Sequence, residues 1–253
     1  MNKSFLFTFL AVVIFLSACN KTANFSSPPL SNYNLQIPGK YITYELDSLL
    51  YINFGAKDTV VTYFAMDSVG AQITDNLGNT AFQIIHSISQ QGPTGPWQPN
   101  NTFVTVPLGN TVDFIENNLR YIKLEEPIQN NFSWQGNSYI DTYDINIAVP
   151  NINDWDLTYL DGWTYVYQNV GQPLTLGNLT FDSTITVNEC NEVIGDTTDP
   201  SSYSEVDYSL EQYANGVGLV YRNFLHREYQ PPTPSTNSYF TGYGVTLTIL
   251  SHN

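Results

Sequence analysis

The segment E-V-D-Y-S-L-E-Q-Y-A-N-G-V-G-L-V-Y-R-N-F-L-H-R-E-Y, residues 205–229, reads as two β-strands folded back on Ala214-Asn215-Gly216. An Asn-Gly pair between apolar runs is the strongest short-range signal for a hairpin, because both residues accept the positive φ angles of a tight turn. Apolar and polar side chains alternate along the second arm, and Gly216 and Gly218 favour a bulge or sharp bend where it begins. This segment therefore predicts an antiparallel hairpin.

The last strand-like segment, residues 243–250, alternates more cleanly. One face is apolar, with Tyr243, Val245, Leu247 and Ile249, and the other carries threonines. Following the hairpin directly, this segment predicts a three-strand meander that closes a large antiparallel sheet.

The rest of the chain repeats the same pattern of short strands and turn signals. Strand-like segments occur at 41–54, 58–68, 73–88 (a hairpin turning on 75–79), 103–106, 111–115, 140–149, 162–170 and 179–187. Residues 90–101, 189–204 and 230–238 read as loops, and residues 116–127 as a helical turn or a strand. The sequence predicts an all-β fold: an antiparallel meander that forms a curved sheet, a half-barrel or a sandwich, with few or no helices outside the signal peptide.

Composition and charge restrict the partners. Of the 253 residues 14% are aromatic and only 12% are charged, with a net charge of −15. Few cations are available to neutralise phosphates, so the charge balance argues against nucleic acid and against electrostatic binding to an anionic membrane surface.

The N-terminus predicts a lipid anchor. Lys3 and the apolar run to Leu16 have the length of a signal peptide, and Leu16-Ser17-Ala18-Cys19 resembles a bacterial lipobox. We expect a signal peptide at 1–18, a lipidated Cys19 that attaches the chain to a membrane, a flexible tether at 19–38 and a single β domain at 39–253. The alternative is an ordinary secretory signal with a chance cysteine.

The sequence contains few candidates for chemistry. Cys190 is left as a lone thiol with a packing role, and His86, His226 and His252 are dispersed, so no catalytic residue and no cofactor are expected. Arg120 is placed to pair with Glu116, or alternatively to bind an anion. Three acids in N-I-N-D-W-D-L-T-Y-L-D-G-W are weak metal candidates, Asp154, Asp156 and Asp161, for which a solvated acidic loop is the commoner explanation.

Several stretches together resemble an uncharacterised group of Bacteroidota envelope lipoproteins. They are G-K-Y-I-T-Y-E-L-D-S-L-L-Y (39–51), I-T-D-N-L-G-N-T-A-F-Q-I (73–84), E-N-N-L-R-Y-I-K-L (116–124), W-Q-G-N-S-Y (134–139), L-T-F-D-S-T-I-T-V (179–187) and Y-A-N-G-V-G-L-V-Y-R (213–222). The resemblance implies source and location, and it carries no catalytic residues. The G-V-G-L-V run is also similar to envelope proteins whose curved antiparallel sheet holds acyl chains.

Two further expectations follow from that resemblance. Surface-exported lipoproteins of this kind often carry an acidic run after the lipidated cysteine, and its absence here favours the outer membrane with the domain facing the periplasm. The repeated Asp-(Ser/Thr) pattern looks like the O-glycosylation acceptor pattern of exported Bacteroidota proteins, with candidate acceptors at Ser48, Thr59, Ser68, Ser183 and Thr197. The alternative is that these dipeptides begin turns.

Three functions remain open. The first is a non-enzymatic, membrane-anchored lipoprotein that binds a lipid or another hydrophobic ligand on its curved sheet. The second is a glycan- or protein-binding module of the envelope, which stacking by exposed Trp97, Trp134, Trp155 or Trp163 would favour. The third is a glycosidase-like enzyme, which needs two carboxylates facing each other across a cleft.

Overall fold

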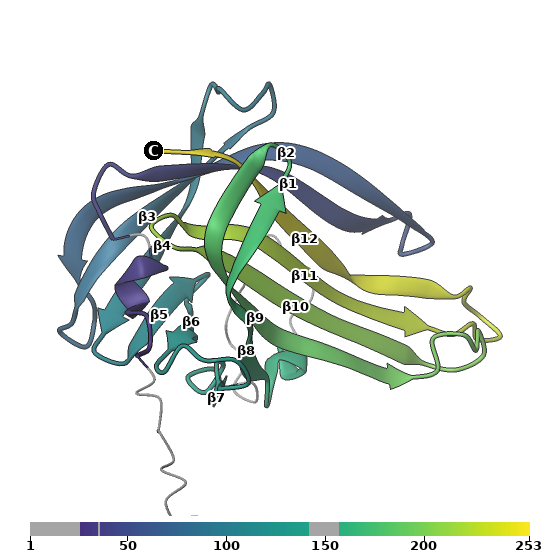
Figure 1. Ribbon diagram of the computed structural model, residues 1–253. Helices are drawn as coiled ribbons and strands as arrows, with labels where there is room; N and C mark the ends of the chain where they lie inside the picture. Colours follow the sequence, from purple (N-terminus) through teal and green to yellow (C-terminus); the bar gives the residue numbers. More distant parts are fainter. Residues whose placement is uncertain (1–25, 35, 142–156) are drawn as a thin grey trace, which may run out of the picture.

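Each strand of the fold pairs with its neighbours in sequence except at one break, between the sixth strand and the seventh, and the first strand pairs with the last. The computed structural model describes residues 26–34, 36–141 and 157–253 (Figure 1). Twelve antiparallel strands form one sheet in the order β6-β5-β4-β3-β2-β1-β12-β11-β10-β9-β8-β7. Their bounds are β1 (Tyr41–Ile52), β2 (Lys57–Thr74), β3 (Thr80–Ser89), β4 (Gln98–Leu108), β5 (Thr111–Glu116), β6 (Leu119–Glu125), β7 (Ser133–Gln135), β8 (Thr164–Leu176), β9 (Leu179–Gly195), β10 (Ser204–Ala214), β11 (Gly218–Gln230) and β12 (Tyr239–His252).

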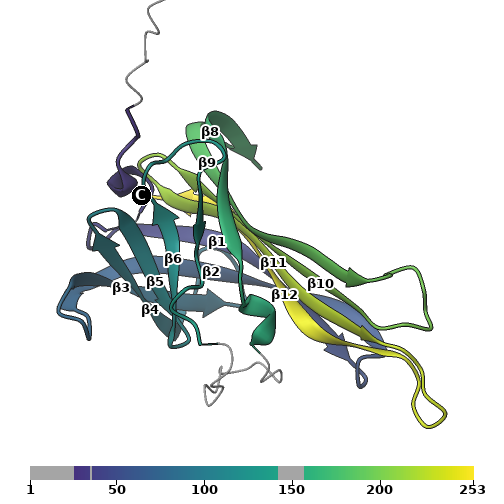
Figure 2. The ribbon, with the colours of Figure 1, turned by 90° about the horizontal axis from the view of Figure 1, so that it is seen from below.

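The sheet is barrel-like and nearly closed. Its two edge strands, β6 and β7, meet at a seam where the Ile122 amide donates to the Gly136 carbonyl at 2.8 Å. The Trp134 indole N–H also donates to the Ile122 carbonyl at 2.8 Å. Gly136 lies so close to Tyr165 that a Cβ there would be 2.4 Å from its ring. Figure 2 shows the strands surrounding a central space, with β10–β12 extending beyond the short strands of the seam.

The hairpin at 205–229 is confirmed. β10 and β11 are joined by a turn at Asn215-Gly216, where Gly216 has φ 77°, and their register shifts once, between Gln212 and Tyr213. The shift fits the two glycines that open the second arm. The expected meander is also confirmed, because β12 pairs with β11 throughout Tyr221 to Gln230.

The interior is packed in two main clusters of buried side chains. The larger lies behind the seam and contains Trp134, Trp163, Tyr165, Tyr167 and Cys190. The second is made by β1, β9 to β12 and their aliphatic side chains, among them Ile42, Val220, Leu247 and Ile249. The lone thiol therefore has the packing role expected of it.

Several boundaries differ from the expectation: β4 begins at Gln98, inside the loop expected at 90–101, and β8 continues to Leu176. The tether does not extend to residue 38, because η1 (Leu30–Asn32) packs on the barrel, with Leu30 and Tyr33 buried in the larger cluster. The Asn32 carbonyl also accepts the Gly216 amide at 2.7 Å. The loop expected from 189 begins only after Gly195, because β9 continues as the partner of β10 and satisfies its backbone groups there.

The remaining elements of the described chain are one further 3-10 turn, η2 (Thr158–Leu160), and connecting loops. None of the described residues forms a helix with the length and hydropathy needed to cross a membrane. The expected signal peptide, Cys19, and residues 142–149 of the strand expected at 140–149 lie outside the described residues, and Ile140 and Asp141 are not in a strand.

Candidate ligand-binding cavity

The barrel encloses a cavity of about 980 Å³. This volume is at the upper end of the range for small-molecule sites, about 300–1,000 Å³. Much of its wall is apolar, because alternate residues of β1, β3, β4, β11 and β12 point inward: Ile42, Leu46, Ile84, Phe103, Phe224, Val245 and Leu247. Phe54, in the β1–β2 turn, also lines the cavity while fully exposed to solvent, so the wall reaches the protein surface there.

One side of the cavity is polar and consists of a buried ion network across five strands. Lys123 Nζ on β6 donates to Glu189 Oε1 on β9 at 2.7 Å and to Glu211 Oε1 on β10 at 2.9 Å. Arg222 on β11 donates through Nε to Glu211 at 2.7 Å and through Nη1 to Glu116 on β5 at 3.2 Å. We call these five residues the ionic wall.

The ionic wall separates the pKa values of its two deepest carboxyls. Burial, together with the charge of Glu211, raises the pKa of Glu189. Burial alone would also raise the pKa of Glu211, but Lys123 and Arg222 outweigh it and hold that pKa at about 2. Ser209 donates to Glu189 at 2.6 Å and the Tyr213 hydroxyl donates to Glu211. Within the described residues, Glu189 thus accepts hydrogen bonds from two side chains, Lys123 and Ser209, and Glu211 from three, Lys123, Arg222 and Tyr213.

Two hydrogen-bond donors on the cavity wall have no partner within the described part of the chain. They are the Trp163 indole N–H, on a side chain that is 3% exposed, and the Asn34 Nδ2 amide. The Asn34 Oδ1 atom is held in place because it accepts the Thr105 hydroxyl at 3.0 Å. Buried donors are normally satisfied, so these two are exceptions. Both nitrogen atoms are covered by neighbouring protein atoms, so a ligand acceptor would reach either one only after its side chain turned toward the cavity.

The pairing expected between Glu116 and Arg120 is wrong. Arg120 is the register partner of Ile115, whereas Glu116 pairs with Leu119, so alternation places the two side chains on opposite faces of the β5–β6 hairpin. Arg120 instead donates to Asp113 at 2.7 Å and to Asp75 at 3.1 Å. Asp75 in turn accepts the Leu77 and Asn79 amides of the β2–β3 turn, so Arg120 ties this turn to β5. Its Nη2 atom is buried and has no partner within the described residues.

The weak metal candidates are not brought together within the described residues. Asp154 and Asp156 lie outside them, and Asp161 follows η2 as an exposed residue. A different cluster is present: Glu205, Asp207 and His226 place one ligand atom each within 4.8 Å of one another. The sequence did not display this pairing, because counting back from a two-residue turn at Asn215-Gly216 places Phe224 opposite Asp207. The observed pairing with His226 requires a turn that extends to Val217 and the register shift between Gln212 and Tyr213.

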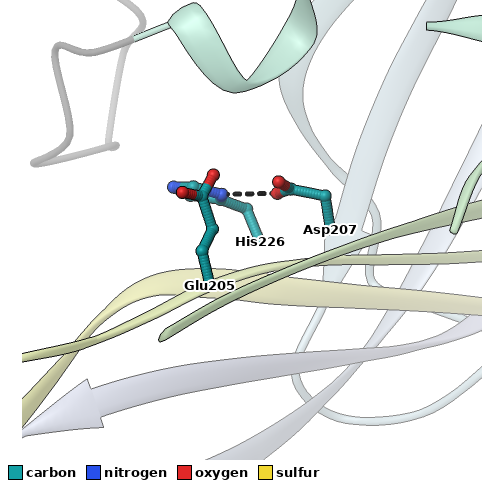
Figure 3. Close-up of side chains that lie close together, drawn as sticks. All are labelled: Glu205, Asp207 and His226. Carbon is teal, nitrogen blue, oxygen red and sulfur yellow. Dashed lines mark hydrogen bonds and ion pairs between the residues drawn. The ribbon is translucent and has the colours of Figure 1, made fainter. Parts of the chain in front are cut away.

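This cluster, which we call the His226 cluster, lies on the sheet beside η2. His226 Nδ1 is 2.7 Å from Asp207 Oδ1, and the ring stacks on Tyr159 of η2 with centroids 3.9 Å apart. Figure 3 shows the three side chains projecting from the same side of the strands. Burial raises the pKa of the Glu205 carboxyl. The hydrogen bond from Tyr203 lowers this pKa and the neighbouring Asp207 raises it, so that the net shift is upward.

The candidate glycosylation acceptors have different environments. Ser48 lies within β1 and lines the cavity, and Thr59, Ser68 and Ser183 are partly buried within strands. Thr197 alone of the five lies in an exposed turn, where the Asp196 carboxylate accepts the Thr198 amide at 2.8 Å. The turn explanation therefore fits Asp196-Thr197 and does not fit the four sites within strands.

The tryptophans give little support to sugar stacking. Trp134 and Trp163 are buried in the larger cluster, Trp97 is half-buried, and Trp155 lies outside the described residues.

No family model matches the chain. A search of curated proteins gave no match either.

Proposed function

We propose that this protein is a lipid-anchored protein of the cell envelope that holds an uncharged amphiphile, rich in oxygen acceptors, inside its barrel and carries out no chemistry on it. The single observation that supports this most is the cavity of about 980 Å³, much of whose wall is apolar and whose lysine and arginine side chains are already bound by carboxylates. The anchor is supported by the lipobox that ends at Cys19. The same sequence features support the outer membrane, with the domain facing the periplasm.

The charges that line the cavity favour an uncharged ligand. Its wall contains five acids and two of the basic side chains, Lys123 and Arg222, and both of these are already bound by carboxylates. A fatty-acid carboxylate or a phosphate would enter without an available cation, and burying an unpaired charge is costly. An ester, ether or hydroxyl oxygen brings no charge to bury, and rotation of the Trp163 or Asn34 side chain would bring an unpartnered donor to it.

Two alternatives are less well supported. The buried Trp134 and Trp163 remove two of the aromatic platforms that a glycan-binding module would use. A glycosidase needs an acid and a second carboxylate on either side of a sugar. Here Glu189 and Glu211 share one lysine between them, which occupies the place where a substrate would have to lie.

The ligand is tested with protein purified from membranes of its native host. Organic extraction, which leaves covalent acyl chains on the protein, should release an uncharged lipid that mass spectrometry identifies. In displacement of a fluorescent hydrophobic probe, a monoacylglycerol should compete at least about tenfold better than the fatty acid of the same chain length at neutral pH. Absence of extractable lipid together with absence of displacement contradicts the proposal, and equal competition by the fatty acid contradicts its charge selectivity.

A pair of substitutions on β12 locates the binding. Val245→Trp places a bulky ring on the cavity wall and should weaken displacement, whereas Thr248→Trp, on the other face of the same strand, should leave it unchanged. The anchor is tested separately, because the N-terminal peptide should carry acyl chains in the wild type and lose them in Cys19→Ser.

A further inference from the structure

The His226 cluster is built on the most regular part of the sheet. Asp207 and His226 are directly opposite each other on β10 and β11, and Glu205 is two residues before Asp207 on the same face. Asp207 is 3% exposed and His226 is 1% exposed, so their positions are fixed by packing. Strands hold ligands more firmly than loops do, which favours a preorganised site.

The sheet concentrates negative charge around this cluster. Glu228 is the register partner of Glu205 on β11, and Glu192 is the register partner of Asp207 on β9. Like charges directly opposite each other destabilise a sheet unless a cation lies between or beside them.

Within the described residues, no ion pair from a lysine or an arginine reaches Glu205 or Asp207. Arg120, Lys123 and Arg222 are engaged by other carboxylates. Arg227, the nearest basic residue in sequence, lies over the Phe240 ring at 5.5 Å. Buried carboxylates in proteins are either paired with cations or bound to metal ions. Within the described residues, the partner of Asp207 is the His226 imidazole, which is itself a metal ligand.

We propose that Glu205, Asp207 and His226 bind one divalent transition-metal ion, with Zn²⁺ as the best fit to the donor set. One imidazole nitrogen and two carboxylate oxygens match the ligands that Zn²⁺ takes at about 2.0–2.2 Å, with a fourth position for water. Ligand atoms within 4.8 Å of one another reach a common ion after small side-chain rotations. The site is distinct from the lipid cavity, whose wall does not include these three residues.

A second His–Asp pair in the same sheet supplies an internal control. His86 Nδ1 lies 2.6 Å from Asp67 Oδ1, and the two residues are register partners on β3 and β2. In the described chain, only the His226 pair has a third ligand close enough to complete a site. Metal binding should therefore depend on His226 and Glu205 and be indifferent to His86.

The test is calorimetric titration of Zn²⁺ into the chelator-treated full-length protein. We expect one saturable site per chain, and an affinity reduced at least about tenfold in Glu205→Gln, whose side chain is only partly buried and whose fold should survive. His226→Gln should lose the site, and His86→Gln should keep wild-type affinity. X-ray absorption of the zinc-loaded protein should show one nitrogen and two carboxylates among the ligands.

Two outcomes overturn the proposal. One is the absence of saturable binding by the wild type. The other is equal affinity of wild type and a folded Glu205→Gln variant, which would assign the zinc to surface groups such as the exposed His252.

Discussion

Replacing Lys123 by methionine isolates the energetics of the ionic wall. Lys123 contacts Glu189 and Glu211 at once, and the three side chains are at most 10% exposed. The methionine fills a similar volume without the charge. Glu211 keeps Arg222 as a partner, whereas Glu189 is left with only the Ser209 hydroxyl. The loss therefore falls mainly on Glu189.

The cost of that loss has an upper limit that follows from proton uptake. Breaking a buried ion pair by removing one partner costs about 3–5 kcal/mol. The folded variant avoids a buried unpaired charge by protonating Glu189, and protonating a carboxyl of ordinary pKa 4.5 at pH 7 costs about 3.4 kcal/mol. We therefore expect Lys123→Met to lower the free energy of unfolding by about 3 kcal/mol at pH 7.

The same limit gives the sign of the pH dependence. In the variant the folded-state pKa of Glu189 is raised above its unfolded value, so the folded state binds more protons than the unfolded state. The deficit should then shrink by about 1.4 kcal/mol per pH unit as the pH falls from 7 towards 5.

Urea unfolding followed by tryptophan fluorescence at pH 5, 6 and 7 measures this deficit. Lys123→Met/Glu189→Gln should recover most of the loss at pH 7, because the glutamine carries no charge. Lys57→Met removes an exposed lysine from β2 and should change stability by less than about 0.5 kcal/mol. A deficit that stays constant with pH, or one that Glu189→Gln does not relieve, would refute the reasoning.

Three further predictions concern other parts of the barrel. Gly136→Ala should lower the free energy of unfolding by about 1–3 kcal/mol, because the added Cβ would meet the Tyr165 ring. It should also speed hydrogen exchange of the Ile122 amide, which donates to Gly136. Gly109→Ala has open space around its Cβ and should be neutral in the same urea and exchange measurements. Burial raises the pKa of the Cys190 thiol to about 12, so in a Cys19→Ser variant this thiol should react with a disulfide reagent at pH 8 only after unfolding, and rapid native labelling would contradict this. Burial would lower the pKa of His86, but the contact with Asp67 outweighs burial, so the folded-state pKa lies above 6.5. The stability that this pair contributes is therefore present below pH 6.5 and should be lost as the pH rises through the folded-state pKa. Urea titrations across this range should show that pH dependence of the free energy of unfolding in the wild type and not in Asp67→Asn.

Much of the strand content was predictable from local pattern. The turn at Asn215-Gly216 and the alternation at 243–250 depend on neighbouring residues, which a sequence displays directly. Barrel closure was not predictable, because it depends on β1 pairing with β12 and on a seam made by Ile122 and Gly136. β1 and β12 lie at opposite ends of the β domain in sequence, and no periodicity records which distant strands meet. The seam joins consecutive strands, but through a backbone hydrogen bond outside any regular ladder, which has no sequence pattern.

The ionic wall escaped prediction because its residues contradict the usual polarity of an inward face. Glu189 was assigned to a polar loop, since an acid after a strand normally marks exposure. The pairing of Glu116 with Arg120 failed for a different reason. Residues four apart lie on the same face of a strand only where the strand is continuous, and here the turn between β5 and β6 separates the two residues.

The ionic wall connects strands on the two sides of the seam, which explains why charged side chains lie beside an otherwise apolar cavity. Lys123 and Glu116 belong to β6 and β5 on one side of the seam, and Glu189, Glu211 and Arg222 belong to β9, β10 and β11 on the other. The backbone ladder is incomplete between β6 and β7, so these ion pairs carry part of the closure that hydrogen bonds supply elsewhere. A purely apolar wall would leave the seam held by few contacts and would favour collapse of the cavity. The residues that close the barrel are therefore also those that set the charge facing a ligand, and a variant that opens the seam should weaken ligand binding along with stability.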